Sequence, residues 1–516
     1  MGDPPPRGLP RSGGRRGGAR VRDPGERGRS GSGPDARAGP RPGSGARLLR
    51  RHAGASGRAP RHAGRRGKEE MKRLLVFAYF FPPLGGGGCQ RTLKLVRYLE
   101  PSGWRSTVVT TRDRDYWILD PTLLEEVPQS AEVLRVGGMT AGKVLLALAR
   151  AGVPVQEAQG SRHAGAFRAL RSLQRWMLLP DAYRGWSHAA LRAGEARLRE
   201  GGIDALWTTS SPESAHLAGL ALKERHHLPW VADFRDPWVG RVTHRSPTPW
   251  HEARHRAMER RVIHAADRVT LVSEALVALY RKRYPDLDPA RFVYLPNGFD
   301  PDDWRRARQN DAGARAQDSS RERAFVLLHA GQLAHRPTVH TLLEAARRVV
   351  ERDPSASRDL RVRFLGGNEE IGAKEETRYG LGPVLEILPS RPHVASLAEM
   401  GRAGALLLLG HGGAADALLY TGKIYEYLSS GRPVLAILDE GPAADLIRAT
   451  AAGIVLRPGD TGAVAAALEN LLLAWRAGED QAVHIPPDRL APWERGNLAS
   501  RASGILAEIA SGSAQS

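Results

Sequence analysis

From residue 71 onward, short apolar runs alternate with helical segments, and this alternation constrains the fold more than any other feature of the sequence. Strands that alternate with helices pair in parallel, and helices cover both faces of the sheet they form. We therefore predict an α/β fold. The predicted strands lie at residues 74–81, 107–110, 204–209, 230–233, 268–273, 292–295, 324–331, 362–367, 384–389, 405–410, 433–438 and 453–458, with helices at 339–350 and 463–474.

A polar stretch at 303–324 divides this alternation into two halves, and we interpret it as an interdomain linker. The halves predict two Rossmann-like domains, 71–302 and 325–487, each with a parallel sheet, followed by a C-terminal helix at 488–516. Two such domains leave a cleft between the carboxyl ends of their strands, where ligands of open α/β sheets bind.

The composition is typical of a soluble protein with more than one domain, since 41% of its 516 residues are hydrophobic and 26% are charged. No run of about 18 apolar residues predicts a transmembrane helix, and no signal-peptide pattern is visible. The single cysteine, Cys89, excludes an intramolecular disulfide and a cysteine-built metal site. We expect a cytoplasmic protein in a reducing compartment.

Residues 1–70 hold 18 basic and 6 acidic residues, which is more than half of the net charge of +20. The segment is rich in Arg, Gly, Pro and Ser, and such a composition cannot bury enough apolar surface to fold. We interpret it as a disordered basic tail that arises from a misplaced gene start, with Met71 as the true first residue. The alternative is a native tail that binds nucleic acid or anionic lipid; we expect no nucleic-acid partner.

The segment LYTGKIYEYLSSGRPVLA places a lysine where a helix begins. Thr421 and Gly422 predict a turn into the helix, so Lys423 lies in its first turn. Outward N–H groups and the positive end of the helix dipole disfavour a cation there. Glu426 lies on nearly the same face, but a lysine N-terminal to a glutamate is the weaker orientation for mutual support. An anion bound at the helix start would justify the lysine.

This segment resembles the nucleotide-sugar segment of glycosyltransferase family 4, in the branch whose motif reads TGK followed by EYL. The resemblance covers the chain from about Met71 to near the C-terminus. It implies the GT-B fold, with an N-terminal acceptor domain and a C-terminal donor domain. In the family, a glutamate on this helix meets the ribose hydroxyls, which implies that role for Glu426. Lys423 would meet the diphosphate, and Thr421 and Gly422 are further donor-binding candidates.

Two observations leave other assignments open for this segment. A surface Lys–Glu pair on a helix that packs through Ile424, Tyr427 and Leu428 would carry the same residues. Many family members also have another glutamate before this one, with seven residues between the two, and that position is Leu418 here. The sugar contacts made by that glutamate are therefore not carried over.

The segment FVLLHAGQLAHRPTVHTLLEA resembles the strand and loop that open the family's second domain, where a glycine and one or two basic residues hold the diphosphate. Gly331 matches the glycine, while Gln332 and Pro337 stand at positions that are basic in many members. Arg336, one position before Pro337, is therefore assigned to phosphate. The alternative is a solvated arginine in a loop.

The segment YFFPPLGGGGCQRT resembles the first-domain loop of the family. Gly85, Gly86, Gly87 and Gly88 would let the backbone approach a ligand without Cβ clashes. No Gly-Lys-Ser/Thr follows, so this is not a Walker loop. A flexible loop is the alternative.

The segment DFRDPW places Asp233, Arg235 and Asp236 at the end of a buried strand, where charged groups need partners or a ligand. The resemblance implies that Asp233 and Arg235 are catalytic, with Asp233 near the reacting centre and holding the acceptor hydroxyl. The alternative is an internal ion pair between Arg235 and an aspartate. By the same analogy, LVSEALVALY and LPNGFDP place three more residues near the cleft: Ser273, Glu274 and Asn297.

Residues 161–186 carry apolar residues at helical spacing beside several arginines. A basic amphipathic helix with a tryptophan can lie on an anionic membrane surface. A core-packed helix with a solvated basic face shows the same pattern.

These matches imply a hexosyl- or related glycosyltransferase that moves a sugar from a nucleotide-sugar donor to an acceptor hydroxyl with retention, in cell-surface polysaccharide or glycolipid synthesis. The resemblance implies no cofactor or metal, since members of the family generally need none; Lys423, Arg336 and helix N-termini could neutralise the leaving diphosphate instead. The expected partners are the donor, a glycan or lipid-linked acceptor and the anionic inner face of the plasma membrane. A nucleotide-sugar epimerase of the same fold and a non-catalytic nucleotide-sugar-binding protein are the alternatives.

Overall fold

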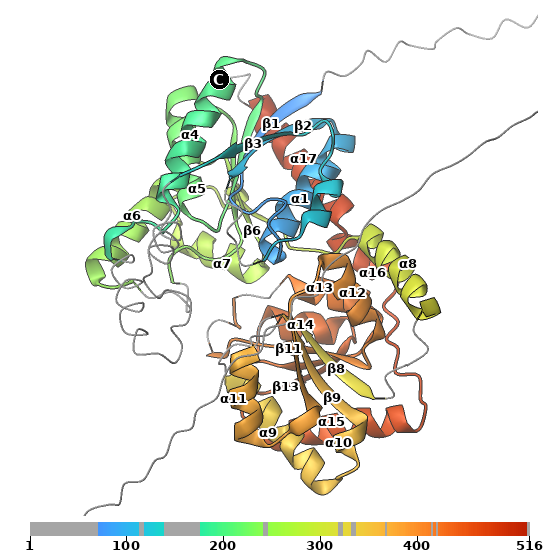
Figure 1. Ribbon diagram of the computed structural model, residues 1–516. Helices are drawn as coiled ribbons and strands as arrows, with labels where there is room; N and C mark the ends of the chain where they lie inside the picture. The colour runs from blue at the N-terminus through green and yellow to red at the C-terminus, as the bar shows by residue number, and fades with distance from the viewer. Residues whose placement is uncertain are drawn as a thin grey trace, which may run out of the picture. The chain divides into compact units, whose positions relative to one another are not determined.

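The computed structural model describes residues 71–112, 118–138, 176–240, 246–317, 324–331, 337–366, 369–413, 416–418 and 422–512. Within these ranges the chain forms two parallel sheets, one in each half of the sequence, and helices flank both (Figure 1). The predicted α/β fold with two Rossmann-like domains is thereby confirmed.

In the described residues, the first sheet has the strand order β3-β2-β1-β4-β5-β6-β7, and each neighbouring pair is parallel. The central strand pairs on both sides, with Leu75 opposite Thr107 on one side and Leu206 on the other. The strands are β1 (Lys72–Phe77), β2 (Trp104–Thr111), β3 (Glu132–Val136), β4 (Ala205–Thr209), β5 (Trp230–Phe234), β6 (Arg268–Leu271) and β7 (Phe292–Tyr294). The helices are α1 (Gly87–Leu99), α4 (Arg184–Arg199), α5 (Ser214–His226), α6 (Pro249–Ala265) and α7 (Glu274–Arg283), with 3-10 turns η1 (Glu100–Ser102), η2 (Pro121–Glu126) and η3 (Pro289–Arg291).

The second sheet has the order β10-β9-β8-β11-β12-β13 in the described residues, again with parallel pairs. Its strands are β8 (Phe325–Ala330), β9 (Leu360–Leu365), β10 (Leu385–Leu388), β11 (Ala405–Leu409), β12 (Val434–Ile437) and β13 (Gly453–Leu456). The helices of this half are α8 (Pro301–Gln317), α9 (Pro337–Arg352), α10 (Ala356–Asp359), α11 (Glu369–Tyr379), α12 (His393–Arg402), α13 (Lys423–Ser429), α14 (Pro442–Ala449), α15 (Thr461–Arg476), α16 (Pro487–Leu490) and α17 (Arg495–Gly512), with 3-10 turns η4 (Gly382–Val384) and η6 (Ala491–Trp493).

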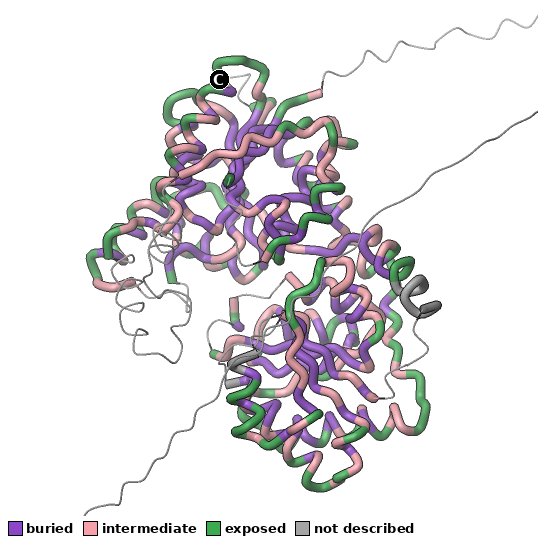
Figure 2. Tube along the Cα trace, viewed as in Figure 1, coloured by how far each residue is buried: buried purple, intermediate pink, exposed green. Residues whose placement is uncertain are grey.

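Several inner strands are buried along their whole length, and Figure 2 shows buried chain in purple through the middle of both sheets. Every residue of β4, β5 and β11 is buried. A parallel sheet covered on both faces has no solvent side, so its strands are continuous apolar runs rather than alternating ones. This is why short apolar runs predict the inner strands correctly.

Two elements of the structure were not predicted from the sequence. Strand β3 was not predicted, because it lies at the edge of the first sheet, is at most half-buried and contains Glu132 and Arg135. Helix α8 was not predicted either; it runs through the segment interpreted as an interdomain linker as far as Gln317. Helix α8 opens with a proline and two aspartates, which favour a helix start, and Trp304 is buried. The polar composition did not indicate a helix, because only part of the surface of α8 packs against the rest of the protein.

The last helix returns to the first domain, and Figure 1 shows α17 beside α1. Leu498 and Leu506 of α17 belong to the same buried apolar cluster as Leu93 and Val96 of α1. The C-terminal helix therefore contributes to the hydrophobic core of the N-terminal domain.

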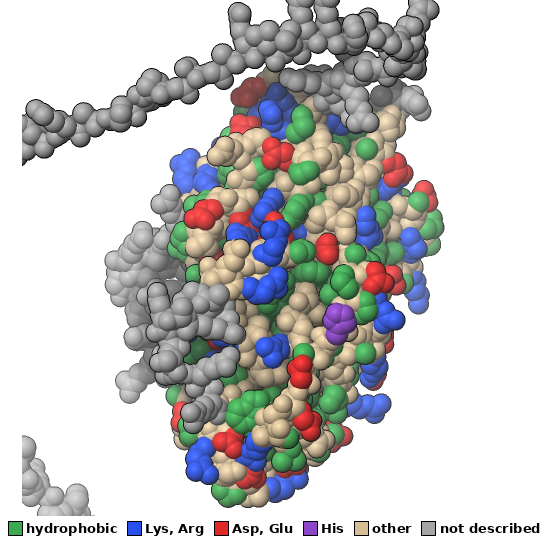
Figure 3. All heavy atoms as spheres, turned by 90° about the vertical axis from the view of Figure 1, so that its right-hand side faces the viewer, with side chains coloured by type: hydrophobic (Ala, Val, Ile, Leu, Met, Phe, Trp, Pro, Cys, Tyr) green, Lys and Arg blue, Asp and Glu red, His purple; other side chains and the backbone are tan. Residues whose placement is uncertain are grey.

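Several predicted features lie outside the described residues. These are the tail at 1–70, residues 161–175 of the amphipathic stretch, Arg336 and Thr421. Within the part of the chain that is described, no helix is long and apolar enough to cross a membrane. On the face shown in Figure 3, acidic and basic side chains are interspersed over the coloured atoms, so this face has no uniformly basic surface.

Candidate functional site

Helix α13 begins at Lys423, as the sequence predicts, and follows β11 at the carboxyl edge of the second sheet. It packs through the predicted apolar residues and one more, Ile424, Tyr425, Tyr427 and Leu428, all of which are buried. The Glu426 side chain keeps 19% of its surface exposed. The helix is therefore anchored by its apolar face and leaves an acid within reach of a ligand.

Lys423 and Gly331 are brought together, although 92 positions separate them in the sequence. The Lys423 ammonium lies 3.4 Å from Nε2 of His329, near the end of β8. A Cβ built on Gly331 would lie only 2.3 Å from Lys423 Nζ, and Gly331 has a φ of +154°. Only glycine lets the ammonium approach this backbone without displacement. Gly422 caps α13 and lies near Asn297, whose Cγ would be 3.6 Å from an added Cβ.

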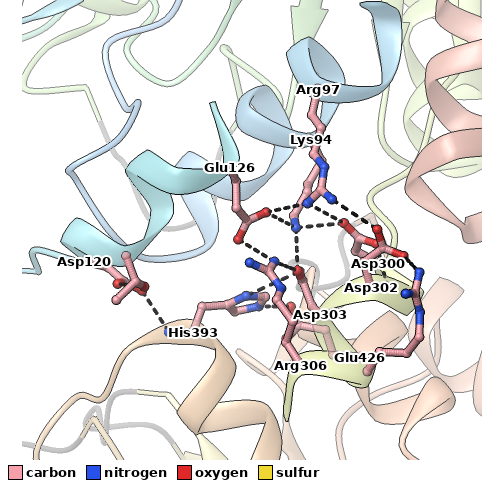
Figure 4. A network of polar contacts seen from close by, with 12 residues as sticks. Lys94, Arg97, Asp120, Glu126, Asp300, Asp302, Asp303, Arg306, His393 and Glu426 are labelled. Carbon is pink, nitrogen blue, oxygen red and sulfur yellow. Dashed lines mark hydrogen bonds and ion pairs between the residues drawn. The ribbon is translucent and has the colours of Figure 1, made fainter. Parts of the chain in front are cut away.

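Glu426 is held by a histidine that sequence reasoning missed. Nε2 of His393, the first residue of α12, lies 2.9 Å from Glu426 Oε1 (Figure 4). The backbone N–H of His393 donates to Asp120 Oδ2 of the first domain at 2.8 Å. Burial opposes a charge on His393, but the hydrogen bond to Glu426 and the nearby carboxylate of Asp303 raise its pKa above the usual value.

A buried group of charges, which we term the Lys94 cluster, adjoins this histidine (Figure 4). The Lys94 ammonium is 2.5 Å from Glu126, 2.7 Å from Asp300 and 2.6 Å from Asp303. Each of these side chains is at most 2% exposed. The three carboxylates approach within 4.8 Å of one another, and the ammonium occupies the place that a bound cation would take. Two arginines, Arg97 and Arg306, also belong to the cluster and contact its acids.

The cluster joins segments from both halves of the chain. Lys94 comes from α1, Glu126 from η2, and Asp303 from α8. Asp303 Oδ2 also lies 3.5 Å from Nδ1 of His393 on α12. A continuous series of charged contacts therefore runs from the first helix of the chain to Glu426.

Asp233 does not have the surroundings predicted for a catalytic acid. It is 1% exposed, and Arg91 Nε and Nη2 donate to its two oxygens at 2.9 and 2.6 Å. The hydroxyls of Thr209 and Thr270 donate to the same carboxylate at 2.8 and 2.7 Å. Burial opposes its charge, but Arg91 and the hydroxyls lower the pKa. These four donors occupy both oxygens of the carboxylate, and the ion-pair partner of Asp233 is Arg91 rather than Arg235.

Arg235 instead lies against the glycine loop. Its Nη1 donates to the carbonyl of Gly88 at 3.1 Å, and a Cβ on Gly88 would be 3.4 Å from the guanidinium. A Cβ on Gly85 would come within 2.7 Å of Ile118, and Gly86 has a φ of +84°. The loop is therefore ordered by close packing, and Gly87 opens α1.

Leu418, which stands where many family members have another glutamate, has a packing role. Leu418 is partly buried against the hydrophobic core of the first domain. Its carbonyl accepts a hydrogen bond of 2.7 Å from the hydroxyl of Ser273, which also caps α7 by accepting from Leu276 N. Leucine at this position thus helps to fix the segment before α13 against the first domain. Glu274 begins α7 next to this contact.

The arrangement is similar to several solved glycosyltransferase structures. A trehalose 6-phosphate synthase from Burkholderia multivorans superposes with a TM-score of 0.57 at 13% identity, covering 86% of this chain and 100% of that chain. Sucrose-phosphate synthase from Thermosynechococcus elongatus gives 0.52 at 15% identity, with 86% and 98% covered. The lipopolysaccharide glycosyltransferase WaaG gives 0.51 at 16% identity, with 84% and 99% covered. At these identities the likeness shows the fold alone.

Sequence comparisons also show similarity to glycosyltransferases. A D-inositol 3-phosphate glycosyltransferase from Geodermatophilus obscurus is 29% identical over 221 residues, which is 42% of this chain and 47% of that protein's length. The model of Glycosyltransferase Family 4 matches residues 85–303, and that of Glycosyl transferases group 1 matches residues 324–473. The two matched regions together span more than half of the sequence, and the chain belongs to glycosyltransferase family 4.

Proposed function

We propose that this glycosyltransferase moves a hexosyl or related group from a nucleotide-sugar donor to an acceptor hydroxyl with retention of configuration, in the synthesis of a cell-surface polysaccharide or glycolipid. The observation that carries the proposal is the convergence of Lys423, Gly331 and Glu426 at the carboxyl edge of the second sheet. A cation beside a partly exposed glycine suits a diphosphate, and a partly exposed carboxylate suits a diol.

In this proposal each residue has a separate task. Lys423 binds the diphosphate of the donor and stabilises the charge that develops on it as the sugar leaves. Gly331 lets the phosphate approach the backbone as closely as the ammonium does. Glu426 accepts the two ribose hydroxyls, because among the described residues its Oε2 receives no hydrogen bond. Arg336, assigned to phosphate from the sequence, remains part of the proposal.

Association with an anionic membrane surface is supported by an exposed aromatic group on the first domain. Trp176, Met177 and Trp250 are 54%, 70% and 58% exposed. The ring of His251 lies 5.1 Å from that of Trp176 and 4.9 Å from that of Trp250, and Arg254 lies over Trp250. Exposed tryptophans next to arginine are suited to the headgroup region of a bilayer.

The proposal is tested by thermal shift of the full chain with a panel of UDP- and GDP-sugars. A true donor stabilises the folded state by mass action, by about 2.7 kcal/mol at a hundredfold excess over Kd. Glu426→Ala should abolish this shift with the fold intact. The matched control is Glu469→Ala on α15, whose carboxylate pairs with Arg352, and it should keep the full shift.

Activity assays separate the alternatives. Consumption of the bound donor without any acceptor would favour an epimerase. Binding without transfer to any glycan or lipid-linked acceptor would favour a non-catalytic binding protein. An unchanged shift in Glu426→Ala would refute the ribose assignment.

A further inference from the structure

His393 lies between two carboxylates that belong to different parts of the chain. Its Nε2 is 2.9 Å from Glu426 Oε1 on α13, and its Nδ1 is 3.5 Å from Asp303 Oδ2 on α8 (Figure 4). The imidazole is 17% exposed, and among the described residues Nδ1 has no hydrogen bond of standard geometry although it is shielded from solvent. Both ring nitrogens therefore face acids.

We infer that His393 is a positioning residue for the donor site, and that as an imidazolium it holds Oε1 of Glu426 so that Oε2 is presented to the ribose of the nucleotide. This inference rests on the proposed function, because it assigns a supporting partner to the residue proposed to bind the ribose. His393 itself does not touch the donor.

The geometry favours the charged ring over the neutral one. A neutral imidazole has one N–H, so it could donate to only one of the two acids, whereas the imidazolium donates from both nitrogens. Asp303 is shared with Lys94 and Arg306, which neutralise most of its charge. Among the described residues, Glu426 forms a salt bridge within 4.0 Å with His393 only, and the buried Arg495 interacts with its charge from a greater distance.

The other charged groups around the ring do not reverse this conclusion. Lys94 repels the imidazolium, but three carboxylates surround its ammonium. Asp120 accepts from the backbone N–H of His393 and adds a further negative charge on the first-domain side. The raised pKa of His393 has the direction expected from these surroundings.

Fixing one oxygen of a carboxylate has a definite effect on binding. A glutamate side chain has three rotatable torsions and loses part of that freedom when it binds a diol. An existing hydrogen bond to His393 removes part of that cost in advance. A hydrogen bond between two charged groups is also among the stronger polar contacts. Loss of His393 should therefore weaken nucleotide binding by about tenfold, because it removes one hydrogen bond to a charged group.

The test is calorimetric titration of the full chain with UDP and with GDP, from pH 6 to pH 9, supported by donor KM and kcat. The variants are His393→Ala, His393→Gln, Glu426→Ala and the double variant His393→Ala/Glu426→Ala. His340→Ala is the matched control, because His340 is a half-exposed histidine of the same domain that contacts Tyr379 and Glu375 instead.

The inference predicts a specific pattern. His393→Ala raises Kd and the donor KM by about tenfold with little change in kcat. His393→Gln, which keeps a neutral N–H donor, recovers part of the affinity. The raised pKa means that the charged contact is complete at low pH and is lost as pH rises through the folded pKa. Wild-type affinity should therefore fall several-fold with rising pH, whereas the affinity of His393→Gln should not change.

Other results have separate meanings. If wild type binds a nucleotide and both histidine variants bind it equally well at every pH, His393 has no positioning role and the proposed function stands. If His393→Ala raises Kd by the same factor in the Glu426→Ala background as it does in wild type, His393 does not act through Glu426 and the inference fails. If wild type binds neither UDP nor GDP, the proposed function and the inference both fail. Should His393→Ala not fold, the pH profile of His393→Gln against wild type decides.

Discussion

Removal of the ammonium from the Lys94 cluster should have a large and strongly pH-dependent effect on stability. Lys94→Met keeps the apolar stem but leaves Glu126, Asp300 and Asp303 facing one another without the central charge. Each pair within 4.8 Å would repel by at least roughly 3 kcal/mol at an effective dielectric constant of about 20.

Proton uptake limits this cost. Keeping a carboxyl group neutral at pH 7, when its ordinary pKa is near 4, costs about 1.4 kcal/mol per pH unit, or about 4 kcal/mol. We therefore expect Lys94→Met to lower the free energy of unfolding at pH 7 by about 3–5 kcal/mol, the range found when one partner of a buried ion pair is removed.

The pH dependence gives a second test of the same reasoning. Burial opposes the charges of Glu126 and Asp300, but Lys94 lowers the pKa of both. Their stabilisation is present above the unfolded pKa and is lost as pH falls through the folded pKa. In Lys94→Met the carboxylates that repel one another take up protons as pH falls, which relieves the repulsion. The difference between wild type and variant should therefore shrink as pH falls from 7 toward 4.

The assay is urea unfolding of the full chain, followed by tryptophan fluorescence at pH 7, 5.5 and 4. The control is Arg97→Met, because the Arg97 side chain is 29% exposed and its ion pairs should contribute about 1 kcal/mol or less. A Lys94→Met protein within 1 kcal/mol of wild type at pH 7, or a difference independent of pH, would refute the argument.

Two further predictions concern the proposed donor site in the second domain and Asp233 in the first domain. Gly331→Ala should fold, because the clashing atom is the flexible end of Lys423. It should weaken UDP binding about tenfold or more while leaving uridine binding unchanged. Lys423→Ala should likewise weaken binding of UDP but not of uridine, and equal losses for the two ligands would contradict the prediction. Asp233→Asn should lower stability by about 3–5 kcal/mol, since the amide places N–H groups toward Arg91, without changing kcat of the folded fraction at a temperature well below its unfolding midpoint. A stable Asp233→Asn protein that has lost turnover would instead restore the catalytic role predicted from sequence.

Much of the fold follows from local sequence, and the reason is the burial of parallel strands. Runs such as ALLLL in β11 are apolar because helices cover both faces of the sheet. The position of Lys423 at the start of α13 also follows from local signals, the turn residues before it and the apolar residues after it. Strand β3 was missed because an edge strand is only half-buried, and α8 was missed because a helix with one packed stripe can be polar overall.

The roles of the charged residues were decided by tertiary structure. The sequence by itself identified Glu426, Lys423 and Gly331 as a candidate set, because each occupies a fixed place in a motif. It could not show that Asp233 is paired with Arg91, which lies 142 positions away. It also could not show that His393 meets Glu426. An ion pair depends on which side chains fold to within a few ångströms of each other, and that distance is set by how helices pack on the two sheets, which no local pattern encodes.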